Sequence, residues 1–190
     1  MSPPLRAKEH QEAIWQGIKD GTLQVIATDH CSFDFHGDKQ NGKNDFTKCP
    51  NGAPGVETRM PIVFSEGVSK GRLSLNEFAA VTSTNPAKIF GMYPKKGVLA
   101  PGSDADIVLM NPDMEVTITK NILHENVDYT PYEGIQVKGW PVMTMVRGQA
   151  VVENERLQVP LGFGRYINRK PVKYTELLKV NGQSCRRHSR

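Results

Sequence analysis

Three residues with chemically versatile side chains stand together at the end of a short apolar run. Residues 25–28 (Val-Ile-Ala-Thr) are followed directly by Asp29, His30 and Cys31. Such a run is typical of a short buried strand. In α/β enzymes, chemical groups gather where strands end and long loops begin. We therefore expect Asp29 to act as a metal ligand or a general base, because a carboxylate at such a position can do either.

The neighbouring side chains allow two other kinds of site. Asp29, His30, Cys31 and His36 are ligand types that zinc accepts, so they could form a compact metal site. In a continuing strand, His30 would point to the face opposite Asp29, and no further ligand follows at the spacing of a zinc motif. Cys31 and His36 could instead form a nucleophilic pair, for which the sequence shows no orienting partner.

A long polar loop follows this segment. Residues 32–55 have no hydrophobic period, although Phe33, Phe35 and Phe46 are spaced through them. A loop of about 20 residues is uncommon and usually functional, and the phenylalanines predict that it is packed. Residues 51–55 (Asn-Gly-Ala-Pro-Gly) are typical of a tight turn at which the backbone approaches another group closely.

The elements that must position these residues change in type along the chain. Amphipathic patterns predict helices at 8–19, 56–69 and 74–82, and Asn85 with Pro86 predicts the N-cap and first position of a short helix ending at 90–91. Beyond residue 97 the patterns predict a strand, a turn and a strand over 97–110, an alternating stretch at 115–118, and a hairpin of 135–147 with 150–153. We place a boundary near residues 92–98, between a barrel-like part and a sandwich-like part.

Composition limits the class of protein. The chain has 190 residues, 38% hydrophobic and 23% charged, which is typical of a soluble globular protein. No apolar run approaches the roughly 18 residues that a membrane helix needs, and residues 1–6 lack the apolar segment of a signal peptide. Three scattered cysteines predict a reducing compartment, and we expect a cytoplasmic protein.

The net charge of +4 comes from the C-terminus, because residues 165–190 hold eight lysines and arginines and one acidic residue. We interpret this segment as a solvated extension rather than a nucleic-acid site, since no aromatic side chains alternate with the final arginines.

Six segments in this order carry a resemblance to a known family. They are residues 1–6 (Met-Ser-Pro-Pro-Leu-Arg), 28–31 (Thr-Asp-His-Cys), 45–48 (Asp-Phe-Thr-Lys), 50–57 (Pro-Asn-Gly-Ala-Pro-Gly-Val-Glu), 83–90 (Ser-Thr-Asn-Pro-Ala-Lys-Ile-Phe) and 102–107 (Gly-Ser-Asp-Ala-Asp-Ile). Together they resemble the C-terminal portion of bacterial dihydropyrimidinases and D-hydantoinases, the metal-dependent cyclic amidohydrolases. The resemblance covers residues 1 to about 175.

The resemblance implies an α/β fold, a (β/α)₈ TIM barrel with a small β-sandwich domain. Members of that family are more than twice as long as this chain. Residues 1–95 would supply the last strands and helices of the barrel with the substrate loop. Residues 96–170 would supply the later part of the β-sandwich, and residues 171–190 a basic tail.

The resemblance also implies a reaction, the hydrolytic opening of dihydropyrimidines or 5-substituted hydantoins. In the family, two zinc ions share a bridging hydroxide and a carboxylated lysine, with four histidines as further ligands. Asp29 matches the aspartate that binds one metal, takes the hydroxide proton and returns it to the leaving nitrogen. Ser2 and Asn51 match positions whose backbone groups hold the imide edge of the substrate ring.

The family's histidines and its lysine would lie outside these 190 residues. Since one aspartate cannot hold two zinc ions, we expect the isolated chain to be inactive. The expected partners are a small cyclic amide and, at full length, three further copies in a homotetramer, with no nucleic acid and no membrane. One alternative is a non-catalytic assembly protein resembling collapsin response mediator proteins, and another is a truncated oligomerisation module. The presence of Asp29 with the Asn51 turn favours the enzyme.

Overall fold

The computed structural model describes residues 5–172 of the chain, so Ser2 and most of the predicted basic tail at 171–190 lie outside the described residues. The chain divides into two compact units, each assembled from three separate segments. The first unit combines 1–15, 27–74 and 110–141, and the second combines 16–26, 75–109 and 142–190. The predicted boundary near residue 95 separates a barrel part from a sandwich part, and it stays a prediction.

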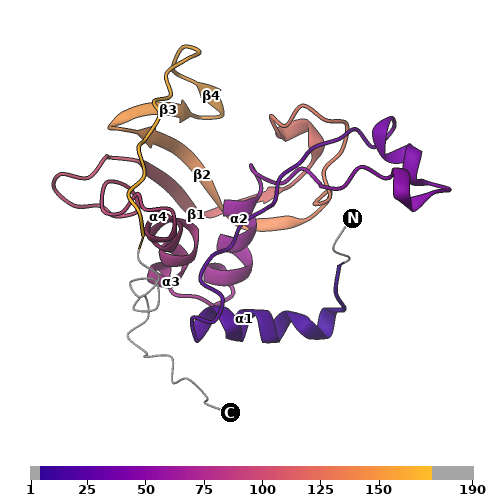
Figure 1. The fold of residues 1–190 in the computed structure, drawn as a ribbon, viewed down its shortest axis with the longest axis horizontal. Helices are drawn as coiled ribbons and strands as arrows, with labels where there is room; N and C mark the ends of the chain where they lie inside the picture. The colour runs from indigo at the N-terminus through magenta and orange to yellow at the C-terminus, as the bar shows by residue number, and fades with distance from the viewer. Residues whose placement is uncertain (1–4, 173–190) are drawn as a thin grey trace. The chain divides into compact units, whose positions relative to one another are not determined.

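Helices form at the three amphipathic patterns (Figure 1). A 3₁₀ turn at Lys8–His10 leads into α1, Gln11–Lys19, and the two together occupy the range predicted for this helix. Helix α2, Arg59–Val63, continues as a π-helical turn at Phe64–Ser69. Helix α3, Leu75–Ala79, passes through a π-helical turn at Ala80–Thr84 into α4, Asn85–Ile89. The remaining 3₁₀ turns are Asp38–Gly42, Phe46–Lys48 and Lys120–Ile122.

The predicted N-cap role of Asn85 is wrong, because the helical backbone runs through it. Thr84 is already helical, with φ −65° and ψ −48°. The buried Asn85 amide instead donates a 2.9 Å hydrogen bond to the carbonyl of Gln24. With the Ile26 N–H bonded to the carbonyl of Val81 at 3.1 Å, it ties residues 24–26 to this helical segment within the second unit.

The sheet has four strands in the order β1-β2-β3-β4. These are β1, Ile107–Thr117, β2, Gln136–Val146, β3, Gln149–Glu153, and β4, Arg156–Leu157. Strands β2 and β3 form the predicted antiparallel hairpin, with Val146 opposite Gln149. Arg147 and Gly148 connect them with φ of 51° and 79°, values typical of the type I′ turn that matches the twist of paired strands.

The first unit contains a hydrophobic core. Ile118, Leu123, Val137 and Trp140 are its buried members. Gly139 lets this core close, because a Cβ there would lie 2.1 Å from Cδ1 of the buried Phe64 ring. The Ser65 hydroxyl accepts from the Lys138 N–H at 3.0 Å, so the π-helical turn and the start of β2 are fixed against each other.

The predicted strand at 25–28 is not formed within the described residues. This segment is extended but has no strand assignment, and the first strand predicted over 97–110 is absent too. A strand in a parallel sheet needs hydrogen-bonding neighbours, and the described residues supply one isolated parallel bridge, from His30 to Ala53. Residues 5–172 therefore do not close a barrel by themselves.

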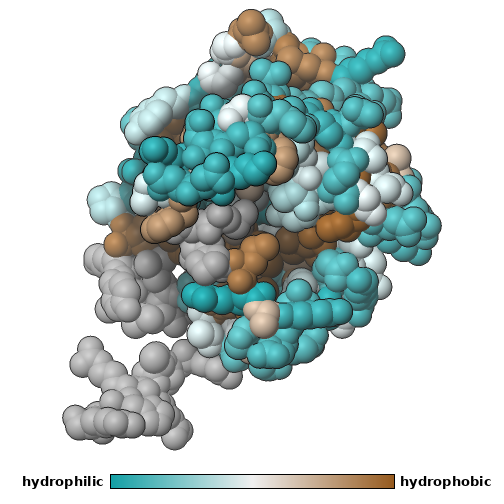
Figure 2. Space-filling view, turned by 90° about the vertical axis from the view of Figure 1, so that its right-hand side faces the viewer, coloured by the Kyte–Doolittle hydropathy of each residue, from teal (hydrophilic) through white to brown (hydrophobic). Residues whose placement is uncertain are grey.

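Large apolar side chains are exposed on both units. Phe46 is 86% exposed, which contradicts its predicted packing, and Leu99 is 73% exposed. Figure 2 shows such brown apolar surface between polar side chains on one face. Larger contiguous apolar patches are typical of sites that contact other protein or a ligand. Among the described residues, no helix combines the length and the apolar character needed to cross a membrane.

Candidate active site

Asp29 lies at the end of the extended segment, next to the bridge between His30 and Ala53. Its backbone φ is 49°, in the left-handed region that aspartate tolerates better than most residues. The residue is exposed, and within residues 5–172 its carboxylate has neither a hydrogen-bond partner nor an ion-pair partner. Such a carboxylate is free to bind a cation or to carry a proton.

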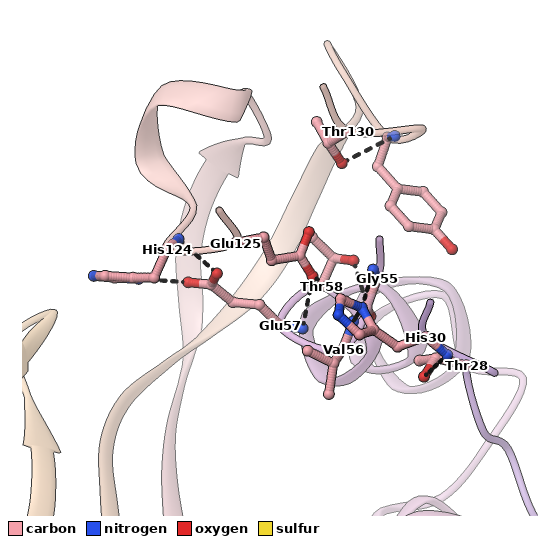
Figure 3. Close-up of polar contacts among 10 residues, drawn as sticks. Thr28, His30, Gly55, Val56, Glu57, Thr58, His124, Glu125 and Thr130 are labelled. Carbon is pink, nitrogen blue, oxygen red and sulfur yellow. Dashed lines mark hydrogen bonds and ion pairs between the residues drawn. The ribbon is translucent and has the colours of Figure 1, made fainter. Parts of the chain in front are cut away.

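The His30 imidazole joins this segment to the far end of the long loop. Its Nδ1 accepts hydrogen bonds from the backbone N–H groups of Gly55, at 3.1 Å, and Val56, at 3.3 Å (Figure 3). Because a backbone N–H can only donate, Nδ1 carries no proton and the neutral ring holds its proton on Nε2. The Nδ1 lone pair is therefore occupied by the loop and is not available to a metal.

A buried carboxylate lies against this junction. The Glu125 side chain is 4% exposed, and its Oε1 lies 3.8 Å from His30 Nδ1 and accepts from the Glu57 N–H at 3.3 Å. Glu57 in turn holds His124, whose N–H and Nδ1 each lie 2.7 Å from a Glu57 oxygen. Figure 3 shows Glu125 between the Glu57–His124 pair and the His30 ring. These contacts connect residues 124–125 to the end of the loop.

The turn at Asn51 presents unused backbone groups. Asn51 is exposed, and no described residue is hydrogen-bonded to its N–H or its C=O. Gly52 has φ 112°, and a Cβ there would lie 2.5 Å from both the Cβ and the carbonyl oxygen of Cys31, so only glycine fits. The Cys31 N–H donates to the Ala53 carbonyl at 3.3 Å. The turn thus offers a free donor and a free acceptor beside the segment that carries Asp29.

Asp128 holds the first part of the loop. Its carboxylate accepts from the backbone N–H groups of Phe35, at 2.6 Å, and His36, at 2.9 Å, and lies 2.8 Å from His36 Nδ1. These bonds hold the pKa of the Asp128 carboxyl at about 2, and the bond from the His36 N–H has the largest effect. Burial, and then the negative charge of Asp128, raise the pKa of the adjacent Tyr129 phenol.

We expect Asp128→Asn to lower stability at pH 6 and to have little effect near pH 2. The folded-state pKa lies below the ordinary 3.8, so the stabilising contribution is complete above about pH 4 and is lost as the pH falls toward 2. Urea unfolding midpoints of both proteins at pH 6, 4, 3 and 2 would measure the converging difference. Asp113→Asn controls for the loss of one exposed charge. A difference that stays constant down to pH 2 would contradict this account.

The two alternative sites are not assembled. Among the described residues, no group of three or more His, Cys, Asp and Glu side chains is placed to hold a metal ion, so the self-contained zinc site is wrong. His36 is bound to Asp128, and no hydrogen bond joins it to Cys31 within residues 5–172. Asp29 and Asn51 are brought to neighbouring segments, and their site roles stay predictions.

Several residues that build this region have no local pattern that predicts them. Glu125 and Asp128 contact residues 68 and 93 positions earlier in the chain. Glu57 belongs to the segment 50–57, whose resemblance to a family motif marked the region without indicating its partner. His124 lies in a loop with no motif around it, and it is held by Glu57.

Comparison with known proteins defines the class. Residues 2–151 match the amidohydrolase family, and the chain belongs to that family. It is 49% identical over 177 residues to a D-hydantoinase of Geobacillus stearothermophilus, covering 93% of this chain and 37% of the relative. It is 46% identical over 171 residues to a D-phenylhydantoinase of Escherichia coli, covering 90% of this chain and 37% of that relative.

Solved structures agree with the sequence relatives. The structure superposes on dihydropyrimidinase from Brevibacillus agri with a TM-score of 0.88 and 50% identity, covering 90% of this chain and 37% of that one. It also resembles the L-hydantoinase of Arthrobacter aurescens, with a TM-score of 0.81 and 38% identity, covering 89% and 37%. The chain thus spans little more than a third of the length of these relatives.

Proposed function

We propose that this chain is the C-terminal part of a hydantoinase or dihydropyrimidinase, which hydrolyses the amide bond of a cyclic diamide. It would supply the last part of a (β/α)₈ barrel and the later part of a β-sandwich. The observation that carries the proposal is the junction at which His30 pairs with Ala53. That junction lies between the free carboxylate of Asp29 and the free backbone groups of Asn51. The names of the relatives favour an enzyme over a non-catalytic assembly protein.

The Asn51 turn suits the substrate class. An amide within a ring offers an N–H and a C=O on one edge, and the free C=O and N–H of Asn51 complement them. Backbone groups read such an edge without a side chain, which leaves the ring substituent to be recognised elsewhere. Ser2 is proposed to add a second backbone contact.

Asp29 is proposed to move the proton during hydrolysis. Its carboxylate takes a proton from the attacking water as the new C–O bond forms at the ring carbonyl. It then gives that proton to the ring nitrogen as the C–N bond breaks, so the ring opens to an acid and an amide nitrogen. One carboxylate thus acts as base and then as acid, and it ends the cycle unchanged.

The residues of this chain do not fit a metal centre on their own. Asp29 is a suitable single ligand, whereas the described residues contain no cluster that could complete the coordination. Zinc, a carboxylated lysine and histidines from outside this chain are proposed as the rest of the site. A homotetramer and a cytoplasmic location are likewise proposals.

Reconstitution tests this function. The chain is combined with zinc and with a separate polypeptide carrying the part of the Geobacillus stearothermophilus D-hydantoinase that the chain does not cover. We expect this reconstituted enzyme to hydrolyse dihydrouracil or hydantoin, and each polypeptide alone to be inactive. A stable complex without activity would favour the assembly role. Activity of the chain alone would contradict the proposal that its site is incomplete.

A further inference from the structure

Lys39 makes two short contacts with the Asn51 turn that the proposed reaction does not use. Its Nζ donates to the carbonyl of Pro50 at 2.5 Å and to the carbonyl of Gly52 at 2.6 Å. The residue is half-buried, and its ammonium lies 5.2 Å from the centroid of the Phe33 ring. A partly buried ammonium group that meets two carbonyls makes charge-assisted hydrogen bonds, which are stronger than neutral ones.

The two carbonyls belong to the peptide groups on either side of Asn51 and Gly52. In a trans peptide the N–H points opposite to the C=O, and no cis bond occurs within residues 50–53. The Pro50 carbonyl faces Lys39, so the Asn51 N–H points away from it, and the Ala53 N–H does so for the same reason. Lys39 therefore fixes the face on which the turn presents its donors.

The other contacts of the turn do not fix the orientation of the peptide groups that Lys39 holds. Cys31 holds the Ala53 carbonyl and packs against Gly52, which fixes the far side of the turn. The N–H and C=O of Asn51 themselves have no partner within the described residues. Without the ammonium, the peptide group before Asn51 and the one after Gly52 could rotate, because φ and ψ are the soft degrees of freedom of the backbone.

We infer that Lys39 is a positioning residue for substrate binding, which holds the peptide groups on either side of the Asn51–Gly52 pair and so keeps the turn in the orientation that reads the amide edge of a five- or six-membered ring. This inference rests on the proposed function. Lys39 acts through the turn and does not touch the ring. Its removal should therefore weaken binding of the ground state and of the transition state equally, which raises KM and leaves kcat unchanged.

The test compares Lys39→Met with two matched variants in the reconstituted enzyme. Lys39→Met keeps the length of the side chain and removes its donors, and we expect KM for dihydrouracil or hydantoin to rise about tenfold with kcat within about twofold. Lys39→Arg can still donate to both carbonyls and should restore most of the binding. Lys48→Met removes an equal charge from the same loop and should leave KM unchanged, because the Lys48 side chain is paired with Asp45 at an exposed position, 3.3 Å away, among the described residues.

An unchanged KM in Lys39→Met would overturn the inference. A rise in KM of the same size in Lys48→Met would overturn it too. A reconstituted wild-type enzyme without activity would instead count against the proposed function. In that case, backbone ¹⁵N order parameters of the 190-residue chain decide the inference. We expect the order parameter of Asn51 to fall from about 0.85 to below about 0.6 in Lys39→Met and to recover in Lys39→Arg. An unchanged order parameter would overturn the positioning role.

Discussion

An Asp29→Asn variant of the reconstituted enzyme is expected to lose about 10³-fold in kcat while its fold stays intact. Asparagine has the shape of aspartate but can neither take the proton of the attacking water nor return it to the ring nitrogen. Initial rates with saturating dihydrouracil or hydantoin measure the loss. Circular dichroism and urea unfolding check that the variant is folded.

Asparagine is a better replacement than alanine because the backbone at this position has a positive φ. Asp29 has φ 49°, a conformation that asparagine adopts readily and that costs alanine roughly 1–2 kcal/mol. An Asp29→Ala variant would also lose activity, but part of that loss would come from backbone strain. Asp113→Asn serves as the control, since Asp113 is 86% exposed on β1. Turnover near that of the wild type in Asp29→Asn would remove Asp29 from the reaction.

The predictions that succeeded are those that local sequence decides. The helix at 8–19 follows from an amphipathic pattern, and α1 with its preceding 3₁₀ turn occupies those residues. The hairpin around Gly148 follows from two strand patterns separated by a turn that accepts positive φ, and β2 pairs with β3 there. In both cases the stabilising contacts lie within a few residues of one another.

The prediction of a strand at 25–28 failed because a strand depends on contacts with residues that are distant in the sequence. Its residues have the composition of a buried strand, but a strand exists only when neighbours accept and donate its hydrogen bonds. Ile26 finds one such partner in the carbonyl of Val81, which belongs to a helical turn. If the proposed barrel is correct, the missing neighbours lie in the part of the relatives that this chain does not cover.

The candidate site was predictable in part. Asp29 could be singled out because it follows an apolar run, and the Asn51 turn because of its glycines and proline, while their site roles stay predictions. Lys39, Glu125 and Asp128 could not, because lysine, glutamate and aspartate in polar loops are ordinarily solvated. Their roles come from contacts across up to 94 positions of the chain, and composition and periodicity carry no information about such contacts.

The second large effect is expected at His30, whose ring connects the Asp29 segment to the end of the loop. His30→Gln should lower kcat/KM of the reconstituted enzyme about 10²-fold, because a displacement of about 1 Å in the groups that position a substrate can cost that much. It should also lower the free energy of unfolding by about 2 kcal/mol, since the N–H groups of Gly55 and Val56 lose their acceptor. Steady-state kinetics and urea unfolding measure the two effects.

The His30→Asn variant distinguishes the effect of the hydrogen bonds from the effect of the imidazole ring. The Oδ1 of asparagine is attached to Cγ, as Nδ1 is in histidine, so it can accept from the same two N–H groups, whereas the Oε1 of glutamine lies one bond farther out. We therefore expect His30→Asn to keep most of the stability and activity that His30→Gln loses. Equal losses in the two variants would show that the imidazole acts through its packing or its Nε2 proton.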